Sequence, residues 1–147
     1  FGNYLIGELI ETITRPTEFD AIGGLEVGAI PVVTAALQSY FRRLRELDWF
    51  WVRNNVKDHG TKKLIEGNLR ENSKVVIVDD VITSGISVVK AVKAVQEIGC
   101  EVELVLSIVD RNEGAAELFN MLGIEYRTLF FGNELLEVEH ANTTGLV

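Results

Sequence analysis

At 147 residues, of which 47% are hydrophobic and 24% charged, the chain has the size and composition of one ordinary globular domain. Its net charge of −8 disfavours nucleic-acid binding, and no apolar run approaches the roughly 18 residues of a membrane helix, so we expect neither kind of partner. The single Cys100 excludes an internal disulfide and a cysteine-cluster metal site, and without a secretory signal the cytoplasm is the expected location.

The first half of the chain predicts a helix followed by a strand, a turn and a second helix. Hydrophobic residues at helical spacing between Leu5 and Ile13 predict the first helix, which Pro16 ends. A short strand over Phe19–Gly23 and a glycine-rich turn over Gly23–Gly28 follow. The other elements predicted in this half are a helix over Ala29–Arg43, an aromatic strand over Trp49–Arg53 and a short strand over Leu64–Glu66.

The second half alternates strands and helices. A continuous β-branched run over Lys74–Val78 predicts a strand that is covered on both faces in a parallel sheet. The elements predicted after it are a helix over Gly85–Ile98 with Gly99 as its stop, a strand over Glu101–Val109, a helix over Glu113–Leu122 and a strand over Ile124–Leu129. This order predicts an α/β fold with a doubly wound, mostly parallel sheet flanked by helices. The tail over residues 133–147 has weak periodicity and receives no assignment.

One concentrated cationic loop, from Arg53 to Lys63, interrupts this acidic chain. Besides His59 it holds Arg53, Lys57, Lys62 and Lys63, against Asp58 as the only acid. This distribution favours a small polyanion as partner. The alternative is a solvated basic surface loop, and the position of the loop one element before a candidate phosphate site favours the functional interpretation.

The strand over Lys74–Val78 leads into the candidate phosphate site. Ligands of such sheets bind at the carboxyl ends of the strands, where this strand delivers Asp79 and Asp80 and then the loop Thr83-Ser84-Gly85-Ile86-Ser87. The hydroxyls of the loop and the first-turn N–H groups of the next helix would form an anion cradle, which the glycine lets a phosphate approach closely. The two acids suit ribose hydroxyls, or a hydrated Mg²⁺ as outer partners.

The alternative is a capped helix start, with Thr83 or Ser84 as N-cap and the acids as solvated turn residues. Two adjacent acids directly after an apolar strand, followed by a hydroxyl-glycine loop that enters a helix, favour the phosphate cradle. The stretch from Val75 to Ser87 resembles the phosphoribosyl pyrophosphate signature of type I phosphoribosyltransferases. It differs from a Walker A loop because no G-K-[ST] follows the glycines.

Three further segments resemble the orotate phosphoribosyltransferase family. They are Arg53–Gly60 with Leu64–Gly67, similar to the family's mobile catalytic loop, Asp20–Pro31, similar to its pyrophosphate-binding turn, and Ile108–Gly114, similar to its D-R-x-E-G segment. In that last segment the arginine contacts the orotate carboxylate. The resemblance runs from about Leu5 to Leu129, in the family's order.

The resemblance implies transfer of ribose 5-phosphate from phosphoribosyl pyrophosphate to orotate in pyrimidine biosynthesis, with Mg²⁺ bound mainly through phosphoribosyl pyrophosphate. It also implies a homodimer in which Lys57 and His59 close over the partner subunit's site, and these two residues with Asp80 are the expected catalytic residues. The expected binding residues are Arg53 and Lys57 for pyrophosphate, with the turn Leu25, Glu26, Val27 and Gly28; Asp79 and Asp80 for ribose; Thr83, Ser84, Gly85 and Ser87 for the 5-phosphate; and Arg111 with Thr83 for orotate.

The sequence departs from the family at two places. Asn54 stands where the family has lysine, so weaker handling of pyrophosphate is expected. The family's N-terminal segment that covers the pyrimidine has no counterpart, so we expect either a portion of a longer protein or an altered base site. Two alternatives follow, a phosphoribosyltransferase for another base and a non-catalytic regulator that senses phosphoribosyl pyrophosphate. For Arg111 the alternative is an ion pair with Asp110 or Glu113.

Overall fold

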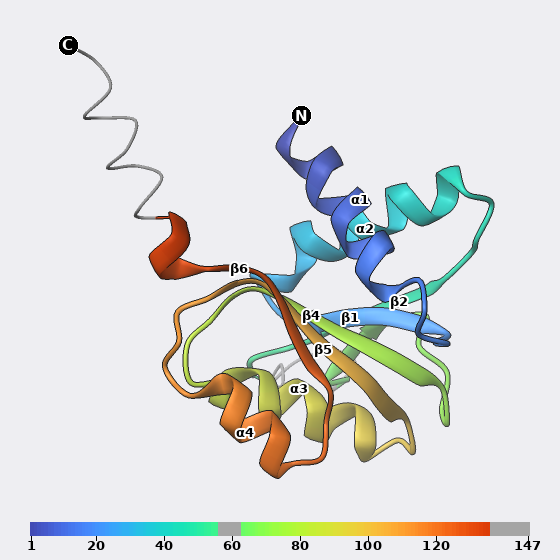
Figure 1. Ribbon diagram of the computed structural model, residues 1–147. Helices are drawn as coiled ribbons and strands as arrows, with labels where there is room; N and C mark the ends of the chain where they lie inside the picture. Colours follow the sequence, from blue (N-terminus) through green and yellow to red (C-terminus); the bar gives the residue numbers. More distant parts are fainter. Residues whose placement is uncertain (56–62, 136–147) are drawn as a thin grey trace.

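The computed structural model describes residues 1–55 and 63–135 of the chain (Figure 1). In chain order, its helices and strands are α1 (Gly2–Thr14), β1 (Ala21–Leu25), α2 (Ala29–Arg42), β2 (Asp48–Val52), β3 (Ile65–Gly67), β4 (Lys74–Ile82), α3 (Ile86–Gln96), β5 (Glu101–Asp110), α4 (Ala115–Met121) and β6 (Tyr126–Phe131). No helix within the two described stretches is long and apolar enough to cross a membrane.

The strands form a sheet in the order β3-β2-β1-β4-β5-β6. Neighbouring strands are parallel except for β3, which pairs antiparallel with β2. Helices α1 and α2 cover one face of the sheet, and α3 and α4 cover the other (Figure 1). The predicted doubly wound, mostly parallel α/β fold is confirmed. The strand order changes direction between β1 and β4, because β1 continues to β2 on one side and β4 continues to β5 on the other.

The β-branched run in β4 supplies both hydrophobic cores. Val75 and Ile77 belong to the core on the α3 side, which also contains Val88 of that helix. Val76 and Val78 belong to the core on the side of α1 and α2. Because successive side chains of a strand point to opposite faces, only an uninterrupted apolar run can fill both cores.

The first boundary that the sequence predicted wrongly lies in β1. The strand begins at Ala21 instead of Phe19 and ends at Leu25 instead of Gly23, so Gly24 and Leu25 belong to the strand and not to the turn after it. A Cβ atom at Gly23 would lie 2.5 Å from the ring of Phe50 in β2, and a Cβ atom at Gly24 would overlap the carbonyl oxygen of Val78 in β4. The two glycines therefore let β1 fit closely between its neighbours.

The second difference concerns β4, which continues to Ile82 instead of ending at Val78. Its partner β5 runs alongside for the whole length, with Asp79 opposite Ser107 and Ile82 opposite Asp110. The two acids are therefore part of the strand, and the ladder to β5 fixes their backbone.

The last helix and strand also begin later than predicted. Gly114, with φ of 101°, is the N-cap of α4, so the helix starts at Ala115. After the helix, Gly123 adopts φ of 68° and the N–H of Ile124 donates to the carbonyl of Phe119. Ile124 is thus occupied in ending the helix, and β6 starts at Tyr126.

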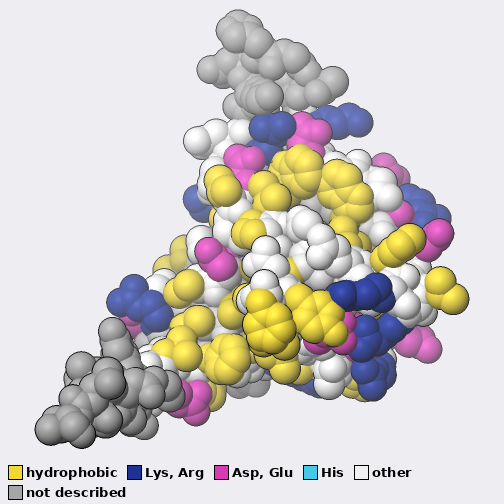
Figure 2. All heavy atoms as spheres, turned by 90° about the horizontal axis from the view of Figure 1, so that it is seen from above, with side chains coloured by type: hydrophobic (Ala, Val, Ile, Leu, Met, Phe, Trp, Pro, Cys, Tyr) yellow, Lys and Arg dark blue, Asp and Glu magenta, His cyan; other side chains and the backbone are white. Residues whose placement is uncertain are grey.

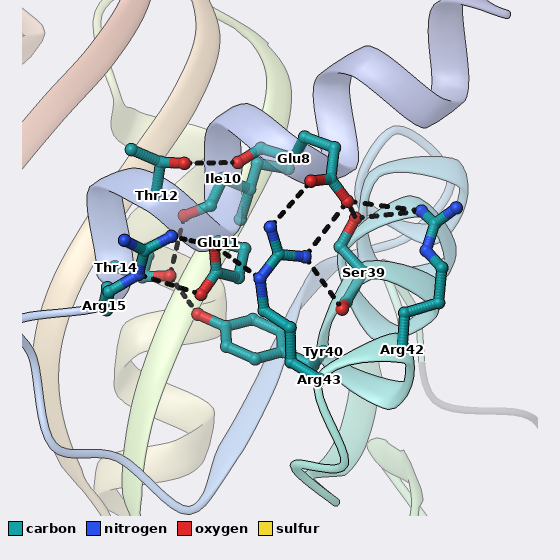
Figure 3. A network of polar contacts seen from close by, with 10 residues as sticks. All are labelled: Glu8, Ile10, Glu11, Thr12, Thr14, Arg15, Ser39, Tyr40, Arg42 and Arg43. Atoms are coloured by element: carbon teal, nitrogen blue, oxygen red, sulfur yellow. Dashed lines mark hydrogen bonds and ion pairs between the residues drawn. The ribbon is translucent and has the colours of Figure 1, made fainter.

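Helix α1 is held against α2 by a group of carboxylates and arginines (Figure 3). Arg43 donates to Glu8 at 2.7 Å and Ser39 donates to the same carboxylate at 2.8 Å, while Arg15 pairs at 2.7 Å with the nearly buried Glu11. The hydrogen bond from Arg43 lowers the pKa of Glu8 to about 2. The carboxylate of Glu8 therefore keeps its charge, and the link between the helices persists, at any ordinary pH.

The outer side of these two helices is partly apolar. Viewed from above, hydrophobic side chains lie among basic and acidic groups (Figure 2). Tyr4, Leu5 and Leu9 of α1 and Phe41 of α2 are exposed. The guanidinium of Arg42 lies 4.4 Å from the centre of the Tyr4 ring and covers part of this surface, so an aromatic and a basic side chain share one exposed patch.

The close packing of β1 gives the first testable prediction. Gly24→Ala should lower the free energy of unfolding by about 2–4 kcal/mol, because the new methyl group meets the backbone of β4 and the Cβ of Ala29. Urea unfolding followed by the fluorescence of Trp49 and Trp51 measures the change. Gly2→Ala is the matched control, because a Cβ there meets nothing within 4 Å, and an equal loss in both variants would contradict the packing argument.

Candidate active site

The candidate site lies where the strand order changes direction, at the carboxyl ends of β1 and β4. The turn after β1 and the acids at the end of β4 meet there. A Cβ atom at Gly28 would overlap a carboxylate oxygen of Asp80 and would lie 2.9 Å from one of Asp79. The structure thus brings together the predicted pyrophosphate turn and the predicted ribose acids, which are about fifty residues apart in the sequence.

Asp79 and Asp80 differ in their surroundings. Asp79 is 8% exposed, whereas Asp80 is exposed. Each carboxylate accepts a backbone hydrogen bond from the next residue, from the N–H of Asp80 at 3.1 Å and from the N–H of Val81 at 2.7 Å. Burial, and after it the charge of Asp80, raises the pKa of Asp79 to about 7. The site therefore contains one carboxyl group that is ready to exchange a proton near neutral pH.

The hydroxyl-rich loop follows these acids into α3. Gly85, with φ of 81°, is the N-cap of the helix and makes no side-chain cap hydrogen bond. The alternative with Thr83 or Ser84 as N-cap is therefore wrong. Thr83 and Ser84 of this loop are half-buried, and Ser87 in the first turn of α3 is exposed. Hydroxyls and first-turn N–H groups at a helix N-terminus can bind an anion together.

Two features of the structure favour glycine at position 85. Its left-handed backbone disfavours any residue with a Cβ atom, and such an atom would lie 3.1 Å from the ring of Phe119 in α4. The loop is thus pressed against α4 on its inner side.

The turn after β1 leads into α2 in the same way. Leu25 is buried and ends β1, so the turn proper is Glu26–Gly28, in which the Glu26–Val27 peptide bond is cis. Gly28 is the N-cap of α2 and again makes no side-chain cap hydrogen bond. A second helix N-terminus is therefore directed to the same edge of the sheet as that of α3.

Asn54 fastens this turn to the start of the basic loop. Its side-chain amide donates to the carbonyl of Glu26 at 2.8 Å, and its backbone N–H donates to the Glu26 carboxylate at 3.0 Å. The N–H of Glu26 in turn donates to the carbonyl of Val52 at 2.8 Å. Asn54 thus makes contacts with the turn that a lysine side chain, which has no amide, would not reproduce in the same form.

The two predicted anion-binding arginines are both paired with glutamates. Arg53 binds Glu66 of β3 at 2.8 Å, and Arg111 binds Glu113 at 3.0 Å. Of the two partners predicted for Arg111, the structure selects Glu113. Lys57 and His59, the other predicted cationic groups, lie outside the described residues.

The turn of Arg111 adjoins the phosphate loop. The N–H of Arg111 donates to the carbonyl of Ile82 at 3.0 Å, immediately before Thr83. This bond extends the ladder between β4 and β5 by one step, so the predicted base residue and the predicted 5-phosphate loop start from neighbouring backbone positions.

A sizeable cleft lies elsewhere in the molecule. It has a volume of about 500 Å³ and is lined by residues such as Asp20, Asp48 and Trp49, at the amino ends of β1 and β2. It is thus at the opposite edge of the sheet from the two helix N-termini and the paired acids. The chemistry of those groups, and not the size of a hollow, places the candidate site.

Comparisons with known proteins agree with this geometry. The model of the phosphoribosyl transferase domain family matches residues 3–128. The orotate phosphoribosyltransferase of Rhodopseudomonas palustris (strain TIE-1) is 40% identical over 141 residues, which cover 93% of this chain and 75% of that protein. The corresponding protein of Streptomyces avermitilis is 42% identical over 132 residues, 89% of this chain and 72% of that one.

The chain belongs to the orotate phosphoribosyltransferase family. A solved structure of the Mycobacterium tuberculosis orotate phosphoribosyltransferase, in complex with phosphoribosyl pyrophosphate, superimposes with a TM-score of 0.80. It is 37% identical, and the match covers 90% of this chain and 75% of that chain. The family that the four sequence segments indicated is therefore confirmed.

Two contacts at the site of this family member were not predicted from the sequence. The pairing of Arg53 with Glu66 was not predicted, whereas Glu113 was one of the two partners predicted for Arg111. The half-buried Tyr126 also donates its hydroxyl to the buried carboxylate of Asp110, beside the turn of Arg111. The one sequence signal for this second contact was the acidic Asp110 at the end of an apolar strand, because a buried carboxylate requires a hydrogen-bond partner.

The paired acids of this phosphoribosyltransferase give a pH prediction. Since folding raises the pKa of Asp79 from 3.8 to about 7, the folded state keeps a proton that the unfolded chain releases. The contribution of Asp79 to the free energy of unfolding should therefore fall as the pH rises from about 4 to 7. Asp79→Asn removes this loss, so its free energy of unfolding at pH 8 should be about 2 kcal/mol higher than that of the unaltered protein. This value allows for the screening of the charge by nearby solvent. At pH 4 the two proteins should differ little.

Urea unfolding at both pH values, without divalent cations, measures this effect. The control is Glu71→Gln, which removes an exposed carboxylate before the other end of β4. Its difference from the unaltered protein should be the same at the two pH values. A pH-independent difference for Asp79→Asn as well would contradict a raised pKa for Asp79.

Proposed function

We propose that the chain transfers the ribose 5-phosphate group of phosphoribosyl pyrophosphate to orotate, giving orotidine 5′-phosphate and pyrophosphate in pyrimidine biosynthesis. The observation that carries the proposal is the meeting of two helix N-termini and two adjacent acids at the carboxyl ends of β1 and β4. Phosphoribosyl pyrophosphate has an anionic group at each end of a ribose, and this arrangement offers an anion site on each side of carboxylates that can accept hydroxyl protons.

The proposed binding mode assigns one end of the substrate to each helix. The first turn of α3 and the hydroxyls of Thr83, Ser84 and Ser87 hold the 5-phosphate. The carboxylates of Asp79 and Asp80 accept hydrogen bonds from the ribose 2′ and 3′ hydroxyls. The turn Glu26–Gly28 and the first turn of α2 receive the pyrophosphate.

The proposed chemistry breaks the bond from the anomeric carbon to the pyrophosphate oxygen, forms a bond from that carbon to a ring nitrogen of orotate, and releases the proton of that nitrogen. Positive charge develops on the sugar and negative charge on the leaving pyrophosphate. Cations at the leaving group are then worth more in the transition state than in the ground state. Arg53 would exchange Glu66 for pyrophosphate, while Lys57 and His59 retain this role as predictions from the sequence.

The carboxylate oxygens of Asp79 and Asp80 fit a role beside Mg²⁺. Both face the turn at Gly28, where the pyrophosphate would lie, and oxygen atoms are the ligands that Mg²⁺ prefers. In the proposed complex Mg²⁺ is held mainly by phosphoribosyl pyrophosphate and water, with the two acids as outer partners. When bound, Mg²⁺ would neutralise the charge of the departing pyrophosphate.

Arg111 is the proposed residue for the carboxylate of orotate, with Thr83 next to the base. Binding would exchange one carboxylate for another, because Glu113 occupies the guanidinium at 3.0 Å. Both partners are about half exposed, so this pair contributes little stability and is easily replaced.

The proposal includes one phosphoribosyltransferase domain that works in the cytoplasm as a homodimer, with the loop after Arg53 closing over the partner subunit's site. A closed loop would exclude water, which otherwise competes with orotate for the activated sugar.

The function is tested by mixing the protein with orotate, phosphoribosyl pyrophosphate and Mg²⁺ and following the ultraviolet absorbance of orotate. We expect absorbance to fall with the release of an equal amount of pyrophosphate. A panel of adenine, hypoxanthine, guanine and uracil under the same conditions should show no comparable turnover. Turnover of one of these bases instead of orotate would favour a transferase for another base, and binding of phosphoribosyl pyrophosphate without any turnover would favour a regulator.

The role of Arg111 gives a separate prediction. Arg111→Ala should raise the KM for orotate about 10- to 100-fold, because a charge-assisted contact to the base is lost, and should leave the KM for phosphoribosyl pyrophosphate nearly unchanged. Steady-state kinetics with each substrate varied in turn measures both constants. Arg70→Ala is the matched control, since Arg70 is an exposed arginine paired with Asp48 near the opposite edge. An unchanged KM for orotate in Arg111→Ala would exclude this contact.

A further inference from the structure

A buried carboxylate stands at the base of the Arg111 turn and is not used in the proposed reaction. Asp110, the last residue of β5, is 2% exposed. One of its oxygens accepts the backbone N–H of Asn112 at 2.7 Å, and the other accepts the hydroxyl of Tyr126 at 2.9 Å. The carboxylate thus joins the turn to the first residue of β6.

The hydrogen bonds continue from Tyr126 into the sheet. The Tyr126 hydroxyl lies 2.9 Å from the hydroxyl oxygen of the fully buried Ser107, which donates to the hydroxyl of Thr128 at 2.8 Å. The Tyr126 ring packs against Phe119 of α4, with 5.1 Å between the ring centres. Burial, and with it the neighbouring Asp110, raises the pKa of Tyr126 above its ordinary value, so the hydroxyl stays protonated and remains the donor to Asp110.

These contacts fix the backbone on both sides of Arg111. On the N-terminal side of the Arg111 side chain, the N–H of Arg111 donates to the carbonyl of Ile82. After it, Asn112 is held by Asp110 in the left-handed conformation, with φ of 57°. An asparagine tolerates this conformation better than most residues, and the bond to Asp110 selects it. The direction of the Arg111 side chain therefore depends on the position of the Asp110 carboxylate.

We infer that Tyr126 is a positioning residue for the base, which acts through Asp110 on the turn that carries Arg111. The inference rests on the proposed function, because it takes Arg111 as the contact to the orotate carboxylate. A neutral Asn or Ser at position 110 could accept the N–H of Asn112 without the cost of a buried charge. A charged acceptor that is shared between the turn and β6 gives a stiffer connection than the turn bond alone.

The test compares kinetics of Tyr126→Phe with those of the unaltered protein. The substitution removes the hydroxyl and leaves the ring on Phe119. The KM for orotate should rise about ten-fold, as expected when a buried carboxylate loses one donor and the turn loosens, while the KM for phosphoribosyl pyrophosphate stays within about two-fold. Tyr4→Phe, which removes the hydroxyl of a tyrosine exposed on α1, should change neither constant.

A double-mutant cycle separates positioning from general destabilisation. If Tyr126 acts through Arg111, Tyr126→Phe should raise the KM for orotate little further when Arg111→Ala is already present. Independent effects that multiply would overturn the inference, as would an equal rise in the KM values of both substrates. Asp110→Asn offers the same comparison if Tyr126→Phe does not fold, because its amide has a single oxygen and cannot accept both the N–H of Asn112 and the Tyr126 hydroxyl as the two carboxylate oxygens do.

The outcomes distinguish this inference from the proposed function. Absence of orotate turnover by the unaltered protein would overturn the proposed function and this inference with it. Normal turnover by the unaltered protein, together with an unchanged KM for orotate in Tyr126→Phe, would overturn this inference alone.

Discussion

β1 and β4 run side by side with no side chain between their backbones at Gly24, and the site depends on this close approach. It brings the turn at Gly28 against the carboxylates of Asp79 and Asp80, so that α2 and α3 begin at the same edge of the sheet. Each helix N-terminus attracts an anion. The acids between them would repel a phosphate but suit sugar hydroxyls, and this alternation of charge matches a ribose that carries an anionic group at each end.

Both arginines near this edge are paired with glutamates of the protein before any substrate binds. Arg53 is paired with Glu66, and Arg111 is paired with Glu113. A pyrophosphate group carries more charge than the carboxylate that it would displace from Arg53, so the exchange gains free energy through charge alone. At Arg111 a substrate carboxylate would replace a protein carboxylate of the same charge. The gain there must come from geometry, which makes the shape of the Arg111 turn more important than its charge.

The sequence predicted well those features that depend on local order. The β-branched run in β4 indicated a strand covered on both faces, and the alternation of strands and helices indicated the doubly wound, mostly parallel sheet. It failed where the structural role of a residue depends on a neighbour that is distant in the sequence. Gly24 looked like a turn residue because the carbonyl of Val78, which forbids a Cβ there, is fifty-four residues away. The bond between Tyr126 and Asp110 requires the register of β5 and β6, which periodicity does not give.

The two ends of the proposed substrate pair are therefore recognised by different kinds of structure. The groups proposed for the phosphates of phosphoribosyl pyrophosphate include backbone N–H groups at two helix N-termini, whose direction follows from the fold itself. The proposed contact to the base is one side chain, and its turn is held by the Asp110 carboxylate and by a hydroxyl from the neighbouring strand. Substitutions in β6 or in the turn can alter base selection while the phosphate sites stay intact. A fold that separates the two tasks in this way can keep one co-substrate and change the acceptor.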